Sequence, residues 1–403
     1  MALTPEQEAA VIALISRTQK TISQLEAETA LVGDKILPIE NSSGTFAVTV
    51  DDVKDYVLKY QDRKSVIING DMRISQRGTS FSAITDGSYS LDRWRYRKIG
   101  AVVHTITQSS VVPTILEAGR KIPFSMKIAV TTADASLAAT DNVVIEQPVE
   151  GFDFARLAQK ESVASIWVKL PLAGVYCLNF RNNASGVADR SLVQEITVNS
   201  PNTWEEKIIS VPASPSAGTW NYTNGAGCSL GLTLYAGSTY QTTAGIWQVG
   251  NFVATSNQVN ACASTSYDAY ITEVQWKEGS VATPFEQRTI QEELALCQRY
   301  FEKSYDLESF AGSGSPSGIV SARAISTVVD QMVPLKISKR AAPSIVIYNN
   351  ATGAAGSVRN ESALTDVNVT PEIIGQNSFA VRLATGFSNG QRATFHYTAS
   401  SEL

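Results

Sequence analysis

Short runs in which apolar and polar residues alternate, separated by turn-forming residues, restrict the fold of this chain more than any other feature. Successive side chains of a β-strand point to opposite faces of a sheet, so alternation predicts a strand with one buried face. Residues 165–170 and 176–180 alternate in this way on either side of a turn and predict a hairpin. Further strands are predicted at residues 191–199, 207–211, 231–235 and 270–277.

Residues 66–288 contain this strand pattern together with all six tryptophans. Many short strands with few helices favour an antiparallel sandwich or jelly roll. Trp94, Trp167 and Trp276 are expected in the core or on a sheet face. The predicted fold class is mainly β: an antiparallel jelly-roll sandwich with an N-terminal helical stalk or anchor and a small C-terminal β domain.

Residues 4–32 are predicted to form one helix, with Thr4 as the N-cap and Pro5 at the first helical position. A stripe at alternating spacings of four and three residues runs along it, consisting of Val11, Ile15, Ile22 and Leu25 with two interspersed threonines. The stripe has two explanations. Either the helix packs on its own domain, or the stripe is the seam of a homo-oligomer.

The patterns divide the chain into four regions: an N-terminal helical region (1–64), the sandwich (65–289), a helical connector with a loop (290–317) and a C-terminal β domain (318–403). The N-terminal region also contains an extended segment at 37–48 and a short helix at 52–60. The connector helix is predicted at 291–303. In the last region, Asn389-Gly390 between residues 379–383 and 393–397 predicts a hairpin, and residues 344–348 predict a strand.

Composition excludes several classes of function. The net charge is −5, so no nucleic-acid partner is expected. No apolar run approaches the roughly 20 residues of a membrane span, and the first residues do not predict a secretion signal. The histidines, His104 and His396, are too few and too isolated for a catalytic or metal site. The cysteines, which are predicted to be separate buried thiols, are Cys177, Cys228, Cys262 and Cys297.

No catalytic motif is recognisable, and the chain is predicted not to be an enzyme. Glycoside hydrolysis requires two carboxylates that flank the scissile bond. Candidates include Asp153, Asp189, Glu205 and Glu206, but their separation cannot be read from the sequence. A polysaccharide depolymerase usually has a long repetitive β-helix, and no such period is visible.

Two loops combine aromatic rings with amides, which is the chemistry that binds sugars. The C–H faces of a sugar stack on aromatic rings, and its hydroxyls form hydrogen bonds with amides and carboxylates. Residues 219–225 and 240–248 therefore predict a glycan-binding site, with Trp220, Asn221, Tyr222, Tyr240 and Trp247 as its residues. The alternative is that Trp220 and Trp247 close the ends of the sandwich or an intersubunit seam.

A calcium ion is the one cofactor considered, because jelly rolls often carry one. Its hard oxygen ligands would come from Asp71, Asp86, Glu278 and Glu286. The spacing of these residues gives no support for such a site. Surface carboxylates, or hydrogen bonds to loop amides, are the simpler explanation, and no metal site is predicted.

Several motifs resemble those of a known family. Residues 69–78 (NGDMRISQRG) and 92–94 (DRW) resemble the opening of a module common in bacteriophage tail-fibre and related virion proteins. Residues 276–288 (WKEGSVATPFEQR) resemble the end of that module, and residues 292–300 (EELALCQRY) resemble the segment that usually follows it. The last residues, 395–403 (FHYTASSEL), are similar to fibre C-termini, and residues 37–60 resemble a virion-attachment segment.

The resemblance implies a jelly roll similar to carbohydrate-binding modules. It also implies a homotrimer, attachment to other virion proteins through residues 1–60, and contact with a bacterial surface glycan. Such a protein is made in the host cytoplasm and lies on the exterior of the virion, on the tail or on the capsid. Three functions follow: a glycan-binding fibre, a capsid fibre or decoration protein with a mainly structural role, and a polysaccharide depolymerase.

Overall fold

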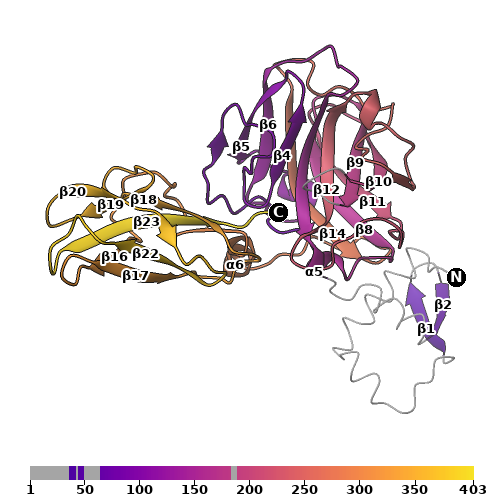
Figure 1. Cartoon of the computed structure of the whole chain (residues 1–403). Coiled ribbons are helices and arrows are strands. Elements are labelled where there is room, and N and C mark those ends of the chain that lie inside the picture. Colours follow the sequence, from indigo (N-terminus) through magenta and orange to yellow (C-terminus); the bar gives the residue numbers. More distant parts are fainter. Residues whose placement is uncertain (1–35, 42–43, 50–63, 183–187) are drawn as a thin grey trace. The chain divides into compact units, whose positions relative to one another are not determined.

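The computed structural model describes residues 36–41, 44–49, 64–182 and 188–403 (Figure 1). The chain divides into two units, Met1–Lys64 and Ser65–Leu403. In the first unit, strands β1 (Ile36–Asn41) and β2 (Gly44–Thr49) pair in antiparallel fashion. The helix predicted at 4–32, its stripe of Val11, Ile15, Ile22 and Leu25, and the helix predicted at 52–60 lie outside the described residues. No described helix is long and apolar enough to span a membrane.

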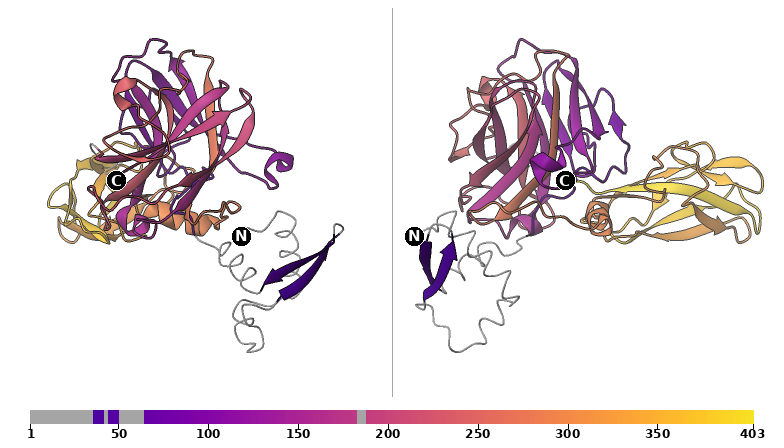
Figure 2. Two further views of the ribbon diagram at one scale, coloured as in Figure 1. Left: turned by 90° about the vertical axis from the view of Figure 1, so that its right-hand side faces the viewer. Right: turned by 180° about the vertical axis from the view of Figure 1, so that it is seen from behind.

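The second unit begins with the predicted antiparallel jelly-roll sandwich, whose two sheets face each other in both views of Figure 2. Sheet I has the strand order β13–β10–β9–β12–β7–β4, and sheet II has the order β11–β8–β14–β6–β5–β3. The strands of sheet I are β4 (Arg95–Ile99), β7 (Asn142–Glu150), β9 (Gly174–Asn182), β10 (Arg190–Val198), β12 (Ala226–Ala236) and β13 (Trp247–Val249). The strands of sheet II are β3 (Ser80–Phe81), β5 (Val103–Ser109), β6 (Ser125–Thr132), β8 (Ser162–Lys169), β11 (Trp204–Val211) and β14 (Asp268–Glu278).

The core of the sandwich lies between the inner faces of the two sheets. Leu178 and Phe180 from sheet I meet Ile166 and Val168 from sheet II, as the alternation predicts. Phe180 contacts the Trp276 ring edge-on, at a centroid distance of 4.9 Å. Trp94, Trp167 and Trp276 are buried, as predicted. The four cysteines are free and buried, also as predicted.

The hairpin predicted for residues 165–180 is wrong. Strand β8 pairs with β11 and β14 in sheet II, whereas β9 pairs with β10 and β12 in sheet I. The turn at residues 170–173 therefore carries the chain from one sheet to the other. Both strands bury one face in the same core, so alternation predicts each strand correctly but does not identify its partner.

The outer face of sheet I is covered rather than open. Every residue of β7 is buried, and β12 is buried along nearly its whole length. Val253 and Ala254, from the segment between β13 and β14, pack on Val144, Cys177 and Val193 of this outer face. The central strands of sheet I are therefore buried on both faces, unlike a sheet with one face in solvent.

Residues 290–403 form a helix and a second β domain. Helix α6 (Ile290–Gln298) begins at the capping box of Thr289 and Glu292. The strands are β15 (Phe301–Lys303), β16 (Val320–Arg323), β17 (Val329–Pro334), β18 (Ser344–Tyr348), β19 (Ser357–Asn360), β20 (Thr365–Asn368), β21 (Pro371–Glu372), β22 (Ser378–Leu383) and β23 (Arg392–Ser400). β23 pairs with β15, β16, β18 and β19, and β17, β22 and β21 form a separate three-stranded sheet. Phe379, Phe395 and Val381 belong to the core between the two sheets.

Two local predictions in this part differ from the structure. The predicted helix at 291–303 ends at Gln298, and residues 301–303 are a strand of the C-terminal domain. Asn389-Gly390 is a turn, with φ of 80° at Gly390, but it does not close a hairpin between β22 and β23. Those strands belong to different sheets, and Asn389 instead accepts a hydrogen bond from the backbone of Ser326.

The motifs at 69–78, 92–94, 292–300 and 395–403 meet in one contact, which we call the domain joint. Gln76 donates to the Asp92 carboxylate and to the Phe301 carbonyl at 2.7 Å. The buried Arg93 forms an ion pair with Glu402, and its guanidinium lies 3.5 Å from the centre of the Tyr300 ring. Residues of these motifs therefore connect the sandwich to the C-terminal domain.

Candidate functional site

Four aromatic side chains form a cluster that we call the aromatic shelf: Phe154, Trp220, Tyr222 and Trp247. The buried Phe154 comes from helix α5 (Gly151–Phe154), directly after β7. Trp220 stacks on it at 5.3 Å and Tyr222 at 6.2 Å, with ring planes inclined by 20° and 2°. Trp247 contacts Trp220 edge-on at 5.5 Å. Tyr222 is 39% exposed, and Trp220 and Trp247 are half-buried.

Close backbone packing fixes the shelf. Gly151 donates to the Gly225 carbonyl at 2.7 Å, and a Cβ at Gly151 would lie 2.6 Å from the Asn221 carbonyl oxygen. The Asn221 side chain accepts from the Thr223 backbone at 2.8 Å and so closes an Asx-turn. The loop therefore holds its rings without help from a ligand.

The indole nitrogens of the shelf are already engaged. Trp220 donates to the Ala217 carbonyl at 3.1 Å, and Trp247 donates to the Pro212 carbonyl at 3.0 Å. Both indole N–H groups are therefore used within the chain, and the Tyr222 ring is the most exposed surface of the shelf. The shelf is suited to stacking against an apolar face.

The structure brings Trp220, Asn221, Tyr222 and Trp247 together but places Tyr240 elsewhere. Tyr240 packs on the outer face of sheet I with Val193 and Val253. The two predicted loops therefore meet through Trp247, and Tyr240 is not part of the shelf. The shelf residue that the sequence analysis missed is Phe154, because nothing in the local pattern around α5 connects it with residues 219–225. The role of these side chains in glycan binding stays a prediction.

The Tyr240 loop lines a separate open groove of about 650 Å³, which we call the polar groove. Glu195 lies in it and accepts from the Thr255 hydroxyl at 2.5 Å and from the Asn257 amide at 3.0 Å. Hydroxyls and amides dominate the rest of the lining: Ser238, Gln241, Thr242, Thr243 and Ser256, with Ala244. Such a surface matches ligands that carry many hydroxyl groups.

A buried ion triad lies on the outer face of sheet I. Glu146 lies between Arg95, at 2.7 Å, and Arg181. Burial alone would raise the pKa of Glu146, but Arg181, Arg95 and Arg97 together hold it below its usual value. Arg95 also donates to the Leu403 carbonyl at 2.8 Å, so the triad is continuous with the domain joint.

The four carboxylates considered for glycoside cleavage have different surroundings. Asp189 accepts from Asn182 and Thr219, and these hydrogen bonds lower its pKa to about 2. Glu205 accepts hydrogen bonds from the backbone N–H groups of residues 199 and 200. Glu206 is exposed on β11, and Asp153 is half-buried in α5.

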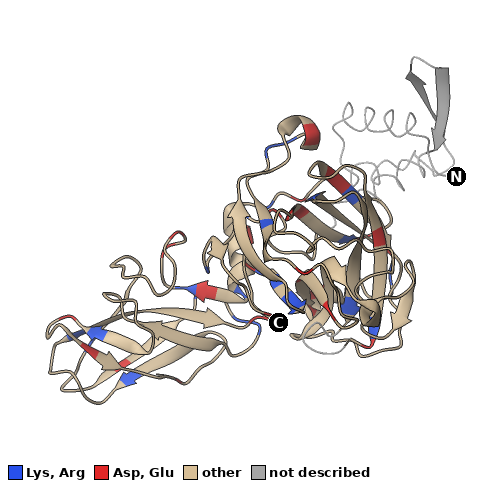
Figure 3. Cartoon of the chain, turned by 90° about the horizontal axis from the view of Figure 1, so that it is seen from above, with Lys and Arg blue, Asp and Glu red and all other residues tan. Residues whose placement is uncertain are grey.

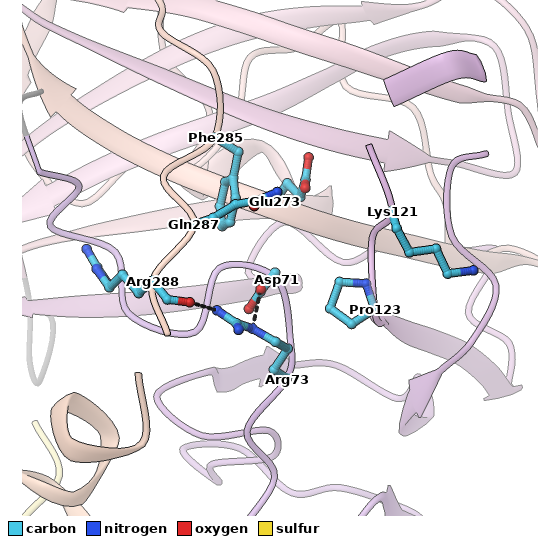
Figure 4. Close-up of a pocket in the computed structure, with 8 residues that line it drawn as sticks. All are labelled: Asp71, Arg73, Lys121, Pro123, Glu273, Phe285, Gln287 and Arg288. Atoms are coloured by element: carbon cyan, nitrogen blue, oxygen red, sulfur yellow. Dashed lines mark hydrogen bonds and ion pairs between the residues drawn. The ribbon is translucent and has the colours of Figure 1, made fainter. Parts of the chain in front are cut away.

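A pair that the sequence analysis missed lies elsewhere: Asp71 and Glu273, which are both buried, line one cavity of about 270 Å³ (Figure 4). They are 202 positions apart in the chain, so no local signal could have joined them.

Each acidic residue considered for calcium has a cationic partner. Asp71 pairs with Arg73, Asp86 with Arg97, Glu278 with Lys160 and Glu286 with Arg288. Within residues 64–182 and 188–403, no group of three or more acidic, histidine or cysteine side chains could hold a metal ion.

No family model matches the chain, and no curated protein matches it. Among solved structures, it aligns with the enzymatically active domain of tailspike protein 4 of bacteriophage CBA120 at 13% identity and a TM-score of 0.27, over 49% of this chain and 21% of that domain. It aligns with a putative sugar-binding protein of Bacteroides thetaiotaomicron at 11% identity and a TM-score of 0.29, over 53% of this chain and 100% of that one. A family 11 carbohydrate-binding module of Clostridium thermocellum, in complex with a mixed-linked tetrasaccharide, aligns at 11% identity and a TM-score of 0.27, over 51% and 99%. Likenesses at such TM-scores carry no argument about function.

Proposed function

We propose that this protein is a bacteriophage virion fibre whose β domains bind saccharide on the surface of the host cell. Residues 1–60 attach it to other virion proteins, and the chain assembles as a homotrimer on the exterior of the particle. It acts by binding and not by catalysis. The motifs at 69–78 and 276–300, which resemble those of tail-fibre proteins, support the virion part of this proposal.

The observation that carries the saccharide part is the aromatic shelf. Trp220 and Tyr222 stack on the buried Phe154, so their orientation is set before any ligand arrives. Their N–H and turn-forming groups are bonded within the chain, while part of the Tyr222 ring is open to solvent. The protein therefore loses little conformational entropy when a sugar ring stacks here.

Binding of the fluorescently labelled full-length protein to host cells tests the proposal. We expect binding that disappears after enzymatic removal of surface polysaccharide. Tyr222→Ala removes the most exposed ring of the shelf and is expected to weaken binding about tenfold or more, as loss of an aromatic anchor does. Tyr348→Phe, a conservative change of a residue in the C-terminal domain, is the control and leaves binding unchanged.

Failure of the labelled protein to bind intact cells would contradict the saccharide proposal. That result would favour the second candidate, a fibre or decoration protein of the capsid with a mainly structural role. One observation favours this alternative. Trp220 and Trp247 are half-buried against the sandwich core and donate their N–H groups to their own chain, as rings with a purely structural task do.

A further inference from the structure

The cavity that contains Asp71 and Glu273 is built from four segments of the chain (Figure 4). Asp71 and Arg73 come from the turn that opens the sandwich, and Glu273 comes from β14. Lys121 and Pro123 come from the segment that leads into β6, and Phe285, Gln287 and Arg288 come from the segment after β14. Figure 4 shows these side chains around one space.

The backbone is distorted where Glu273 lines the cavity. The pairing of β14 with β8 shifts register between Thr272 and Gln275, and Glu273 has φ of 48°, which non-glycine residues rarely adopt. Gly70 presses into this bulge: Val274 donates to its carbonyl at 3.0 Å, and a Cβ at Gly70 would lie 2.1 Å from the Val274 oxygen. Bulges and unfavourable φ values are commonly retained where they aim a side chain at a functional position.

One polar atom of the cavity has no partner. Asp71 is 5% exposed, and its Oδ2 pairs with Arg73, but its Oδ1 is buried without a hydrogen bond from any described residue. Glu273, in contrast, accepts two hydrogen bonds from Arg120. Buried polar atoms in proteins are nearly always bonded, so the Oδ1 atom of Asp71 calls for a group from outside the chain.

The charges of the cavity restrict what that group is. Arg73 pairs with Asp71, Arg120 pairs with Glu273, and Arg288 pairs with Glu286 and Glu293, so the charges in and around the cavity are balanced. A metal ion would find both carboxylates already paired with arginines. An anion would leave the Asp71 oxygen unpaired or repelled. Burial also raises the pKa of Asp71, and Arg73 offsets this rise only in part. A hydroxyl suits both protonation states of the carboxyl group, because it can donate and accept a hydrogen bond.

We propose that this cavity binds one neutral sugar residue of a surface saccharide, through a hydroxyl on Oδ1 of Asp71. The cavity volume of about 270 Å³ is near the lower end for small-molecule sites. Lys121 and Gln287 are exposed at its rim and supply donors to neighbouring hydroxyls. Phe285 and Pro123 supply the apolar wall for the C–H face. Figure 3 shows that basic and acidic residues are interspersed along the ribbon of the described chain.

This site is separate from the aromatic shelf and does not depend on it, although both take saccharide. The test uses the full-length protein with three probes: the methyl glycosides of glucose, galactose and mannose. Binding is followed by calorimetry and by saturation-transfer NMR. Asp71→Asn keeps the shape of the side chain but changes the atom that receives the hydroxyl. The double variant Lys121→Met/Gln287→Ala changes only exposed rim residues, so its folding is not at risk.

We expect at least one glycoside to bind, and both variants to weaken its binding about tenfold or more, the loss expected for a hydrogen bond to a charged group. Lys160→Met, which changes an exposed lysine elsewhere, leaves this binding unchanged. If Trp220→Ala abolishes binding and the cavity variants do not, the proposal for the cavity fails while the shelf proposal stands.

Three other outcomes overturn the inference. No binding of any of the three glycosides to the folded protein is the first. The second is thermal stabilisation of the wild type, but not of Asp71→Asn, by calcium chloride or by inorganic phosphate, which would make the cavity an ion site. The third is release of reducing sugar from host polysaccharide that Asp71→Asn or Glu273→Gln abolishes, which would replace binding by hydrolysis.

Discussion

The domain joint and the aromatic shelf are both built from sequence-distant residues, yet they use their polar groups in opposite ways. In the joint, the fully buried Arg93 pairs with Glu402 across the boundary between two domains, and Gln76 bonds to Asp92 on one side and to Phe301 on the other. On the shelf, the polar groups of Trp220 and Asn221 are bonded to their own loop or its neighbour. The polar groups of the joint therefore hold the two domains together, whereas the shelf leaves part of its ring surface exposed to solvent.

This difference explains why the most recognisable motifs are not the binding site. Tyr89 of the joint donates to the Leu403 carbonyl, and burial, with Glu402 nearby, raises its pKa to about 12, so it remains a donor throughout the ordinary pH range. Tyr300 donates to Glu150 at 2.7 Å. A ligand would have to break such contacts to reach these groups. Functional side chains are better sought in loops held by the sandwich.

Arg93→Leu tests the joint and has the largest expected effect. It leaves the Glu402 carboxylate buried without its closest cation and removes the guanidinium from the Tyr300 ring. Breaking a buried ion pair costs about 3–5 kcal/mol, and we expect a loss of that size in the free energy of unfolding, measured with guanidinium chloride. The double variant Arg93→Leu/Glu402→Leu is the control and is expected to lose less, because both charges of the pair are removed and Arg77, the other partner of Glu402, keeps Asp92 at 3.9 Å. A loss below about 1 kcal/mol in the single variant would show that the joint does not hold the two domains together.

The sequence predicted individual strands well but did not predict which strands and loops lie together. Alternation at 191–199 and 270–277 predicts β10 and β14 because a strand with a buried face determines its own period. Partners are not local: the runs at 165–170 and 176–180 enter opposite sheets, so the predicted hairpin failed. Similar composition also misled the prediction that joined Tyr240 to Trp220, because Tyr240 packs on the outer face of sheet I, whereas Trp247 of the same loop contacts Trp220.

Glu146→Gln tests whether the ion triad, like the joint, stabilises the fold through buried charges. Its expected effect on stability is the second largest. The change leaves Arg95 and Arg181 facing each other without the carboxylate between them, which costs about 3 kcal/mol at pH 7. The folded-state pKa of Glu146 lies below its usual value, so its contribution is present above about pH 4.5 and is lost as the pH falls through the folded-state pKa. Unfolding experiments from pH 7 to pH 3 should therefore show the wild type converging on the variant. Parallel curves would contradict this origin of the stability.

Asn224→Ala has the smallest expected effect and tests whether the two regions are independent. Asn224 lies at the end of the shelf loop, and its amide donates to the Arg340 carbonyl at 3.0 Å, while Arg340 donates back to the Asn224 carbonyl at 2.9 Å. Arg340 also bonds to the carbonyls of Ser401 and Glu402, so this side chain connects the shelf to the joint. The variant removes one exposed hydrogen bond, and we expect a loss of about 1 kcal/mol or less in stability. A double-mutant cycle with Tyr222→Ala, measured by saccharide binding, then decides between the two arrangements. Additive effects would mean that the shelf binds independently of the joint. A coupling energy above about 0.5 kcal/mol would mean that the C-terminal domain positions the shelf, and the contrast between the two regions would then describe two parts of one site.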